Sequence, residues 1–275
     1  MSNKPLNIFI EAIGLAEGQL TGIGKVTVEY IKELQRIDAR NNYFLYAHDP
    51  EKHVAVTNPR WTIVRRSGFL PKKAGEFKAK WMSHRESFKR SGNIAALFQY
   101  FYYRTAKVVT EVLVFIAEFY QSAFFHYRFR SFFEKHGIGL MLSTSAHFIP
   151  QRPVNGCRTM AMIYDLVWKL YPETMGISTR LIMNLITKRN MHRPDCYVSI
   201  SEATRRDAIA HLDIEKPIIP IPLAADREFF YDGCPEKMIS RVKKKYGITG
   251  RYILTVSTIE PRKNIASLIR AFCLM

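Results

Sequence analysis

The sequence predicts an α/β protein built on a doubly wound parallel sheet, and three observations carry this prediction. Short apolar runs alternate with segments of helical period, which is typical of strands covered by helices on both faces. The length of 275 residues suits one large domain or two ordinary ones. A hydrophobic content of 47% supports a packed core and argues against a disordered chain.

Seven apolar runs are short enough to be buried strands of this sheet. They cover residues 6–10, 43–48, 61–64, 138–144, 159–164, 196–200 and 217–221. Helices are predicted between several of them: one with an apolar face from Ile23 to Ile37, and others at 178–192 and 202–212.

We expect residues 1–226 to form this domain and residues 227–250 to be a linker with a short charged helix ended by Gly247. Residues 251–275 are expected to begin a second α/β domain. Within them, residues 252–258 predict a strand, and apolar residues at helical spacing predict a helix: Ile265, Leu268, Ile269 and Phe272.

The segment at about 69–135 is aromatic and basic and predicts an inserted helical region. Fourteen aromatic residues lie between Phe98 and Phe133, and residues 60–135 hold 15 Lys/Arg against 5 Asp/Glu. Charged residues interrupt every apolar run long enough to cross a bilayer. Three roles stay open: packing on the domain's own sheet, contact with an anionic membrane or lipid acceptor, and binding of nucleic acid.

The overall charge and the cysteines limit the class of protein. The net charge of +17 indicates an anionic partner. The four cysteines form no CxxC pair, which disfavours a zinc site or a disulfide framework and suits a reducing compartment. The N-terminus carries no long apolar run, so no signal peptide is expected. We predict a cytoplasmic protein, peripheral at the inner face of a membrane, without a nucleic-acid partner.

Candidate ligand-binding residues follow the predicted strands, because open α/β sheets bind ligands beyond the carboxyl ends of their strands. Gly22, Gly24 and Lys25 open a helix whose free N–H groups would favour an anion, and a plain structural turn is the alternative. His147 follows another strand as a candidate base or a simple loop residue. The eight histidines show no metal-binding spacing, so no metal is predicted.

Two later segments carry further candidates. Tyr164 and Asp165 end a strand, where a carboxylate would hold a substrate hydroxyl or cap the next turn. Ser201 is placed to cap a helix, and Arg205 in that helix would face an anionic ligand.

The segment "EPRKN" (260–264) carries the strongest local signal. Arg262 and Lys263 precede a helix for which Asn264 is the candidate cap. Two cations at a helix N-terminus suit a diphosphate, and a solvated basic loop is the alternative.

Five motifs in order resemble retaining glycosyltransferases of the GT-B fold, family 4. They are "GIGKVTVEYIKEL" (22–34), "MIYDLVWKLYPE" (162–173), "VSISEATRRDA" (198–208), "IPLAADREFF" (221–230) and "ILTVSTIEPRKNIASLIRAF" (253–272). The resemblance implies an N-terminal Rossmann-like acceptor domain and a C-terminal domain that binds a nucleotide sugar. It also implies that a hexose such as mannose or glucose is transferred from an NDP-sugar to a saccharide or lipid-linked acceptor.

The resemblance also assigns roles to residues of this chain. Arg262 and Lys263 would bind the donor diphosphate without a metal or other cofactor, and Gly22 and Gly24 would approach the reacting sugar. Asp165 and Tyr164 would be catalytic. From their positions beyond the predicted strands, and not from the resemblance, Lys25, His147, Ser201 and Arg205 are the candidate acceptor-binding residues.

The sequence departs from the family pattern at two points. Tyr164 replaces the usual histidine, and a phenol donates a hydrogen bond rather than titrating near neutral pH. The family's Glu-x7-Glu motif would follow Met275, so we expect a truncated form with weak or no activity. The alternative is a non-catalytic domain that binds an acceptor or a membrane surface and works with a separate donor-domain chain.

Overall fold

In the computed structural model the chain forms two compact units, Met1–Pro222 and Leu223–Met275. The described residues are 4–15, 20, 22–66, 80, 83, 86, 94–145, 149–150, 152–175, 180–181, 183–225, 233–257, 259 and 261–274.

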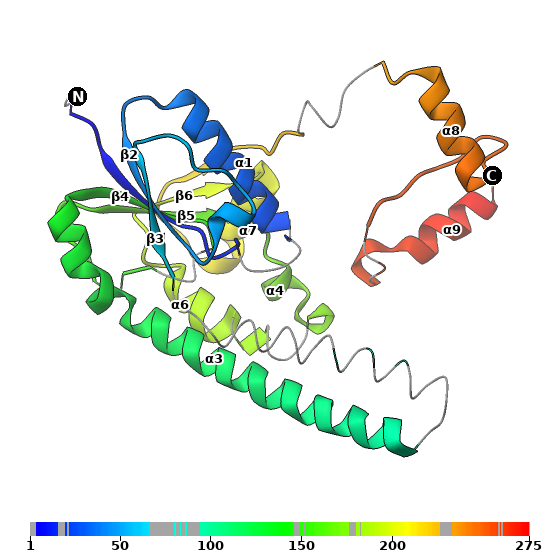
Figure 1. Ribbon diagram of the computed structural model, residues 1–275, viewed down its shortest axis with the longest axis horizontal. Coiled ribbons are helices and arrows are strands. Elements are labelled where there is room, and N and C mark those ends of the chain that lie inside the picture. The colour runs from blue at the N-terminus through cyan, green and yellow to red at the C-terminus, as the bar shows by residue number, and fades with distance from the viewer. Residues whose placement is uncertain are drawn as a thin grey trace. The chain divides into compact units, whose positions relative to one another are not determined.

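The first unit is built on a seven-stranded sheet in which every pair of neighbouring strands is parallel (Figure 1). The strand order is β3-β2-β1-β4-β5-β6-β7. The strands are β1 (Asn7–Glu11), β2 (Asn42–Ala47), β3 (Trp61–Arg65), β4 (Ile138–Ser143), β5 (Arg158–Ile163), β6 (Cys196–Ser199) and β7 (Ile218–Pro220). All seven predicted strands are present, which confirms the doubly wound, Rossmann-like α/β class.

Helices connect the strands. They are α1 (Gly22–Ile37), α3 (Ile94–His136), α4 (Val167–Leu170), α6 (Lys188–Asn190) and α7 (Glu202–Leu212), with short 3-10 turns at Pro50–Lys52 (η1) and Pro172–Thr174 (η2). The helix predicted at 178–192 is present at its described residues up to 190, but Met183–Thr187 (η3) is a π-helix that leads into the short α6. The Asn184 side-chain amide donates a hydrogen bond to the backbone carbonyl of Arg180 at 2.9 Å. A side chain thus bonds a backbone carbonyl of the preceding helical turn.

The two faces of the sheet carry different cores, because successive strand residues point to opposite sides. On one face, Ile8 and Ile10 pack with Val28 and Ile31 of α1. On the other face, Phe9 is fully buried among aromatic side chains from β2 and the C-terminal part of α3. The ring of Phe9 lies 4.9 Å from that of Phe133 and 5.4 Å from that of Phe129, between centroids.

The aromatic and basic segment forms one long helix, α3, over its described part. Phe125, Phe129 and Phe133 are buried against the sheet, so the last turns of α3 pack as core. Before Phe125, none of the α3 side chains that the structure describes is buried. Core packing therefore accounts for only part of this helix. The predicted segment from about 69 to 93 lies almost entirely outside the described residues.

The described part of the second unit contains α8 (Glu236–Tyr246), the 3-10 turn η4 (Pro261–Lys263) and α9 (Ile265–Cys273). Gly247 ends α8 in the left-handed conformation, as predicted. The strand predicted at 252–258 was wrong: residues 251–257 form no strand. A strand needs a hydrogen-bonded neighbour, and this unit offers none among its described residues. Apolar side chains of this segment remain exposed, Val256 by 88%.

A hydrogen-bonded turn joins α1 to β2 and makes the stability of the first unit depend on pH. Asp38 accepts hydrogen bonds from the Tyr43 hydroxyl at 2.6 Å and from the Asn41 amide group at 2.7 Å. Burial alone would raise the pKa of Asp38, but these bonds and those from the backbone N–H groups of Asn41 and Arg40 outweigh it. The pKa of Asp38 therefore lies well below its usual range.

A carboxyl whose pKa is lowered by folding stabilises the fold at neutral pH and loses that contribution as the pH falls. We expect Asp38→Asn to lower the free energy of unfolding by about 2 kcal/mol near neutral pH and by less at about pH 3. Urea unfolding of both proteins at the two pH values measures this. If the free energy of unfolding fell by the same amount in wild type and variant between neutral pH and about pH 3, the role of Asp38 would be contradicted.

Candidate functional site

The candidate site lies at the switch point of the sheet, between β1 and β4. From β1 the chain builds β2 and β3 on one side, and it then builds β4 to β7 on the other. Ligands of open α/β sheets bind beyond the carboxyl ends of the strands at such a point. The last residues of the two central strands, Glu11 and Ser143, are paired neighbours there.

Glu11 is the centre of a buried polar cluster. Its carboxylate is fully buried and accepts hydrogen bonds from the hydroxyls of Ser143 at 2.8 Å and Ser145 at 3.1 Å. It also accepts from the backbone N–H of Ile13 at 2.8 Å, which fixes the chain as it leaves β1. Glu11 was not among the predicted site residues, although a carboxylate that directly ends an apolar strand is a signal in the sequence.

Tyr164 follows β5 and lies near this cluster. Burial, with the negative charge of Glu11 and the neighbouring Tyr30, raises the pKa of Tyr164 to about 12, and a hydrogen bond with the Thr27 side chain offsets part of this effect. The phenol is therefore neutral at neutral pH. Thr27 belongs to α1, so side chains of α1, β1 and the end of β5 meet at this place.

Asp165 is exposed beside Tyr164 and takes the turn-capping role, while its contact with a substrate hydroxyl stays a prediction. Its Oδ1 accepts a hydrogen bond from the N–H of Val167 at 3.3 Å, so it helps to begin α4. Its other carboxylate oxygen accepts no hydrogen bond within the described part of the chain. One oxygen is thus structural, while the other is available to a ligand.

The two glycines at the start of α1 differ in their surroundings. A Cβ on Gly24 would lie 2.7 Å from the carbonyl oxygen of Gly14 and 2.9 Å from Leu20, so Gly24 permits close packing of the loop on the helix. A Cβ on Gly22 would meet nothing within 4 Å. At the start of α1, Gly22 and Lys25 are exposed, whereas Gly24 is enclosed.

This difference gives a matched test. We expect Gly24→Ala to lower the free energy of unfolding by about 2 kcal/mol, because the added methyl group overlaps backbone atoms. Gly22→Ala is expected to change it by less than about 1 kcal/mol, since the methyl group enters open space within a helix. Thermal unfolding of the two variants measures both values. Similar losses for both glycines would show that the close contact at Gly24 is unimportant.

Ser201 and Arg205 have structural partners. The Ser201 hydroxyl accepts from the N–H of Thr204 at 3.0 Å and so caps α7. Thr204 donates through its own hydroxyl to the carbonyl of Tyr164 at 3.1 Å, which ties α7 to the candidate site. Arg205 forms an ion pair with Glu202 at 2.8 Å. His147 lies outside the described residues.

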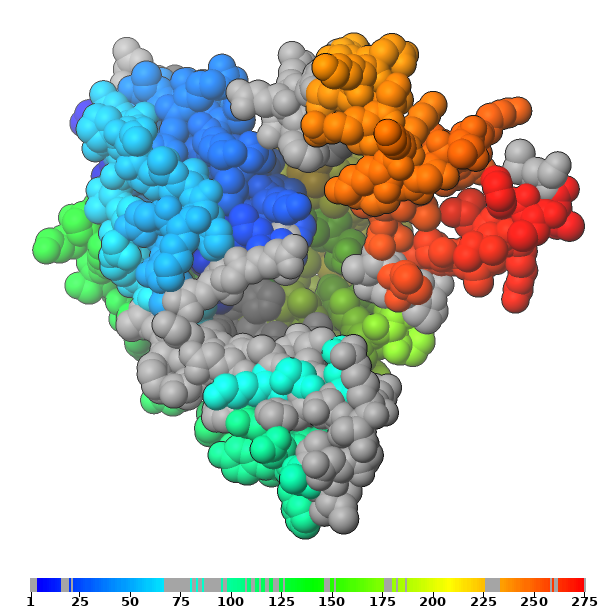
Figure 2. All heavy atoms as spheres, turned by 45° about the vertical axis from the view of Figure 1, so that its right-hand side comes forward, coloured from blue at the N-terminus to red at the C-terminus, as the bar shows by residue number. Residues whose placement is uncertain are grey.

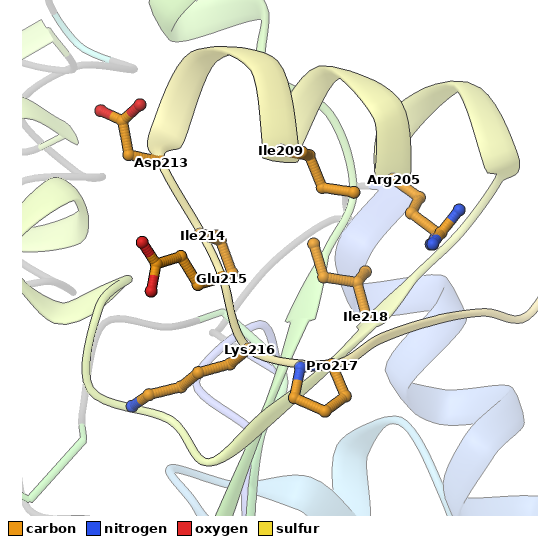
Figure 3. A pocket seen from close by; sticks show the side chains of 8 residues that line it. All are labelled: Arg205, Ile209, Asp213, Ile214, Glu215, Lys216, Pro217 and Ile218. Atoms are coloured by element: carbon orange, nitrogen blue, oxygen red, sulfur yellow. The ribbon is translucent and has the colours of Figure 1, made fainter.

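A surface pocket of about 490 Å³ lies between α7 and the segment that leads into β7 (Figure 3). Its lining includes Ile209 on α7 and Pro217 and Ile218 at the start of β7. Pro217 and Ile218 lie at the amino end of β7, whereas Glu11 lies at the carboxyl end of β1. Lys216, also in the lining, donates to the carbonyl of Pro194 at 2.7 Å. Glu11, Tyr164 and Asp165 do not line the pocket, but Arg205, a predicted acceptor-side residue, does.

Arg262 and Lys263 lie in the second unit, in the turn η4 directly before α9, and both are exposed. Asn264 takes the predicted capping position with a positive φ of 51°, but its side chain makes no capping hydrogen bond. Among the described residues of the chain, no group of three His, Cys, Asp or Glu side chains could hold a metal ion.

Comparisons with known proteins support the class suggested by the motifs. No family model matches the chain. Three Escherichia coli sequences, each described as serotype-specific mannosyltransferase WbdA, are 30% identical over 149 residues. The match covers 53% of this chain but only 17% of the relative's length. The chain is thus related in sequence to part of a glycosyltransferase, in agreement with the resemblance to GT-B enzymes.

A solved structure also aligns with the chain. It is a sucrose-phosphate synthase from Thermosynechococcus elongatus, with 11% identity and a TM-score of 0.37. The alignment covers 88% of this chain and 99% of that one. The fold assignment made above rests on the strand pairing of the first unit and not on this likeness.

Proposed function

We propose that this chain takes part in glycosyl transfer. The reaction would move a hexose such as mannose or glucose from an NDP-sugar to a saccharide or lipid-linked acceptor, with retention at the anomeric carbon. The sequence similarity to a mannosyltransferase carries the proposal. The polar cluster at the switch point of the sheet supports it, because that is where an open α/β unit binds its ligand.

The first unit supplies the acceptor side in this proposal. The free oxygen of Asp165 accepts a hydrogen bond from an acceptor hydroxyl and aligns it. Tyr164, neutral because its pKa is raised to about 12, donates a hydrogen bond to a sugar oxygen. Gly22 and Lys25 offer an open helix N-terminus and a cation for an anionic group. Glu11 is a positioning residue, since it is fully buried and holds the loops that leave β1 and β4.

The second unit supplies the donor side. Arg262 and Lys263 bind the diphosphate of the NDP-sugar and offset the charge that develops on the leaving nucleotide. Two cations supply this stabilisation, so the proposed transfer needs no metal or other cofactor. The described part of the second unit has no strand and so offers no sheet edge for a nucleotide. We therefore expect the 275-residue chain to transfer sugar weakly or not at all by itself.

One observation favours the second candidate function, a non-catalytic acceptor or membrane-surface domain that works with a separate donor-domain chain. Much of α3 exposes large apolar side chains, among them Phe98 by 73%. Such a surface suits a lipid-linked acceptor or a location at a membrane. Within the described residues, no helix is both long and apolar enough to span a bilayer.

Two assays on the purified chain test these functions. One follows transfer from GDP-mannose and UDP-glucose to mannose oligosaccharides, and the other follows oligosaccharide binding by saturation-transfer NMR. Binding without transfer supports an acceptor-side unit. Binding with efficient transfer supports the reaction but contradicts the expected weak activity. Absence of both contradicts the proposed function.

A further inference from the structure

Helix α3 exposes a continuous apolar surface on the side away from the sheet. We call this surface the outer face of α3 and define it by six side chains, each between 45% and 64% exposed: Tyr102, Val109, Leu113, Ile116, Tyr120 and Tyr127. Figure 1 shows α3 as one long helix, and Figure 2 shows part of it at the surface of the molecule. A soluble domain rarely leaves so many large apolar side chains in water without a partner.

The spacing of these residues places them in one line along the helix. At 3.6 residues per turn, all six fall within about 60° of one another. Phe125, Phe129 and Phe133, which pack on the sheet, lie roughly 180° away from this line. The packing that buries the C-terminal turns therefore cannot cover the outer face.

Further exposed apolar residues widen the outer face. Val108 and Phe124 are 50% and 45% exposed and mark its two margins. Together they extend the apolar band to about 160° of the helix circumference. The contact seam of a coiled coil uses two of every seven positions and is narrower. The width of the apolar band therefore favours a binding partner with a broad apolar surface over a partner that is a single helix.

The net charge of this part of the sequence indicates which kind of partner suits the outer face of α3. Residues 60–135 carry 15 Lys/Arg and 5 Asp/Glu, which is more than half of the chain's net charge of +17. On α3 itself, Arg128, Arg130 and Lys135 are exposed and lie within about 90° of the middle of the outer face, and Arg130 forms an ion pair with Glu134 at 2.9 Å. Arg104 is also exposed, but it lies roughly 150° from the middle of the outer face. Apolar and tyrosine side chains with cations around them match the interface of an anionic bilayer, where rings meet the headgroup region and cations meet the lipid phosphates.

We propose that the outer face of α3 binds the surface of an anionic lipid bilayer, with the helix axis parallel to the membrane plane. The line from Tyr102 to Tyr127 is about 38 Å long at 1.5 Å per residue. Contact along this length brings many apolar side chains to the membrane at once. The inference deepens the membrane contact included in the proposed function, but it does not depend on sugar transfer.

Flotation of the purified 275-residue chain with lipid vesicles tests the proposal. One set of vesicles contains phosphatidylcholine alone, and the other contains about 30% phosphatidylglycerol. We expect at least about tenfold stronger binding to the anionic vesicles. The double variant Val109→Glu/Ile116→Glu should lose at least about tenfold of this binding, because both carboxylates would enter the lipid interface.

The matched control is Ile37→Glu, which places the same side chain at an exposed isoleucine of α1, 63% exposed. It should bind anionic vesicles like the wild type. Circular dichroism checks that the variants keep their helices, as expected for substitutions at exposed positions. Because no sugar donor is present, failure of transfer leaves this result unaffected.

Three results would overturn the proposal. The first is wild-type binding that ignores the anionic lipid content, and the second is a double variant that binds as well as the wild type. The third is a wild type that leaves vesicles unbound but self-associates in analytical ultracentrifugation, with the self-association lost in the double variant. That last result would assign the outer face of α3 to a second copy of the chain.

Discussion

Replacing Phe9 by alanine is expected to lower the free energy of unfolding by about 4 kcal/mol, the largest effect of any substitution considered for this chain. The ring is fully buried and lies against rings from two other elements, Tyr46 in β2 and Phe129 and Phe133 in α3. Alanine leaves a cavity at the only described place where α3 joins the core. We therefore also expect the variant to loosen α3.

Urea unfolding measures the loss of stability, and hydrogen exchange of residues 125–136 measures the loosening of α3. Ile37→Ala is the control, because that side chain is 63% exposed and its removal should cost less than about 1 kcal/mol. A loss below about 1 kcal/mol for Phe9→Ala would contradict the described packing of α3 on the sheet.

Replacing Glu11 by alanine is expected to cost about 3 kcal/mol. The change leaves the buried hydroxyl of Ser143, the hydroxyl of Ser145 and the N–H of Ile13 without their acceptor. The free energy lost comes from polar groups that lose their hydrogen bonds to a buried carboxylate. The loops that leave β1 and β4 should also lose their fixed positions, so saccharide binding should weaken.

Glu29→Ala is the matched control for Glu11→Ala. Glu29 forms an exposed ion pair with Lys32 at 2.7 Å, and such pairs contribute less than about 1 kcal/mol. Urea unfolding of the two variants should therefore differ by at least about 2 kcal/mol. If both variants were equally stable, the buried cluster around Glu11 would not support the site.

The sequence was sufficient to predict the parallel sheet and several helix ends. Strands that are apolar along their whole length are typical of a parallel sheet covered by helices on both faces. All seven strands predicted for this sheet are present. Ser201 caps α7 and Gly247 ends α8, because local hydrogen bonds and backbone conformation decide such positions.

The features that the sequence did not reveal depend on contacts between distant residues. Glu11 gains its role from hydroxyls more than 130 positions away. The aromatic pattern of α3 was compatible with core packing and with a membrane surface, and the contacts of Phe9 show that the C-terminal turns are core. Residues 252–258 have the composition of a strand, but strand formation also requires a neighbouring strand.

The central claim is that the carboxyl side of the sheet in the first unit binds an acceptor sugar through Asp165. Its most direct test is the dissociation constant of a mannose disaccharide, measured by NMR titration for wild type, Asp165→Asn and Glu215→Gln. Asparagine keeps an oxygen for the N–H of Val167 but removes the charge, while Glu215 lies on the opposite side of the sheet. The account predicts roughly tenfold weaker binding for Asp165→Asn and unchanged binding for Glu215→Gln. Equal affinity of wild type and Asp165→Asn, or no binding by the wild type, would contradict it.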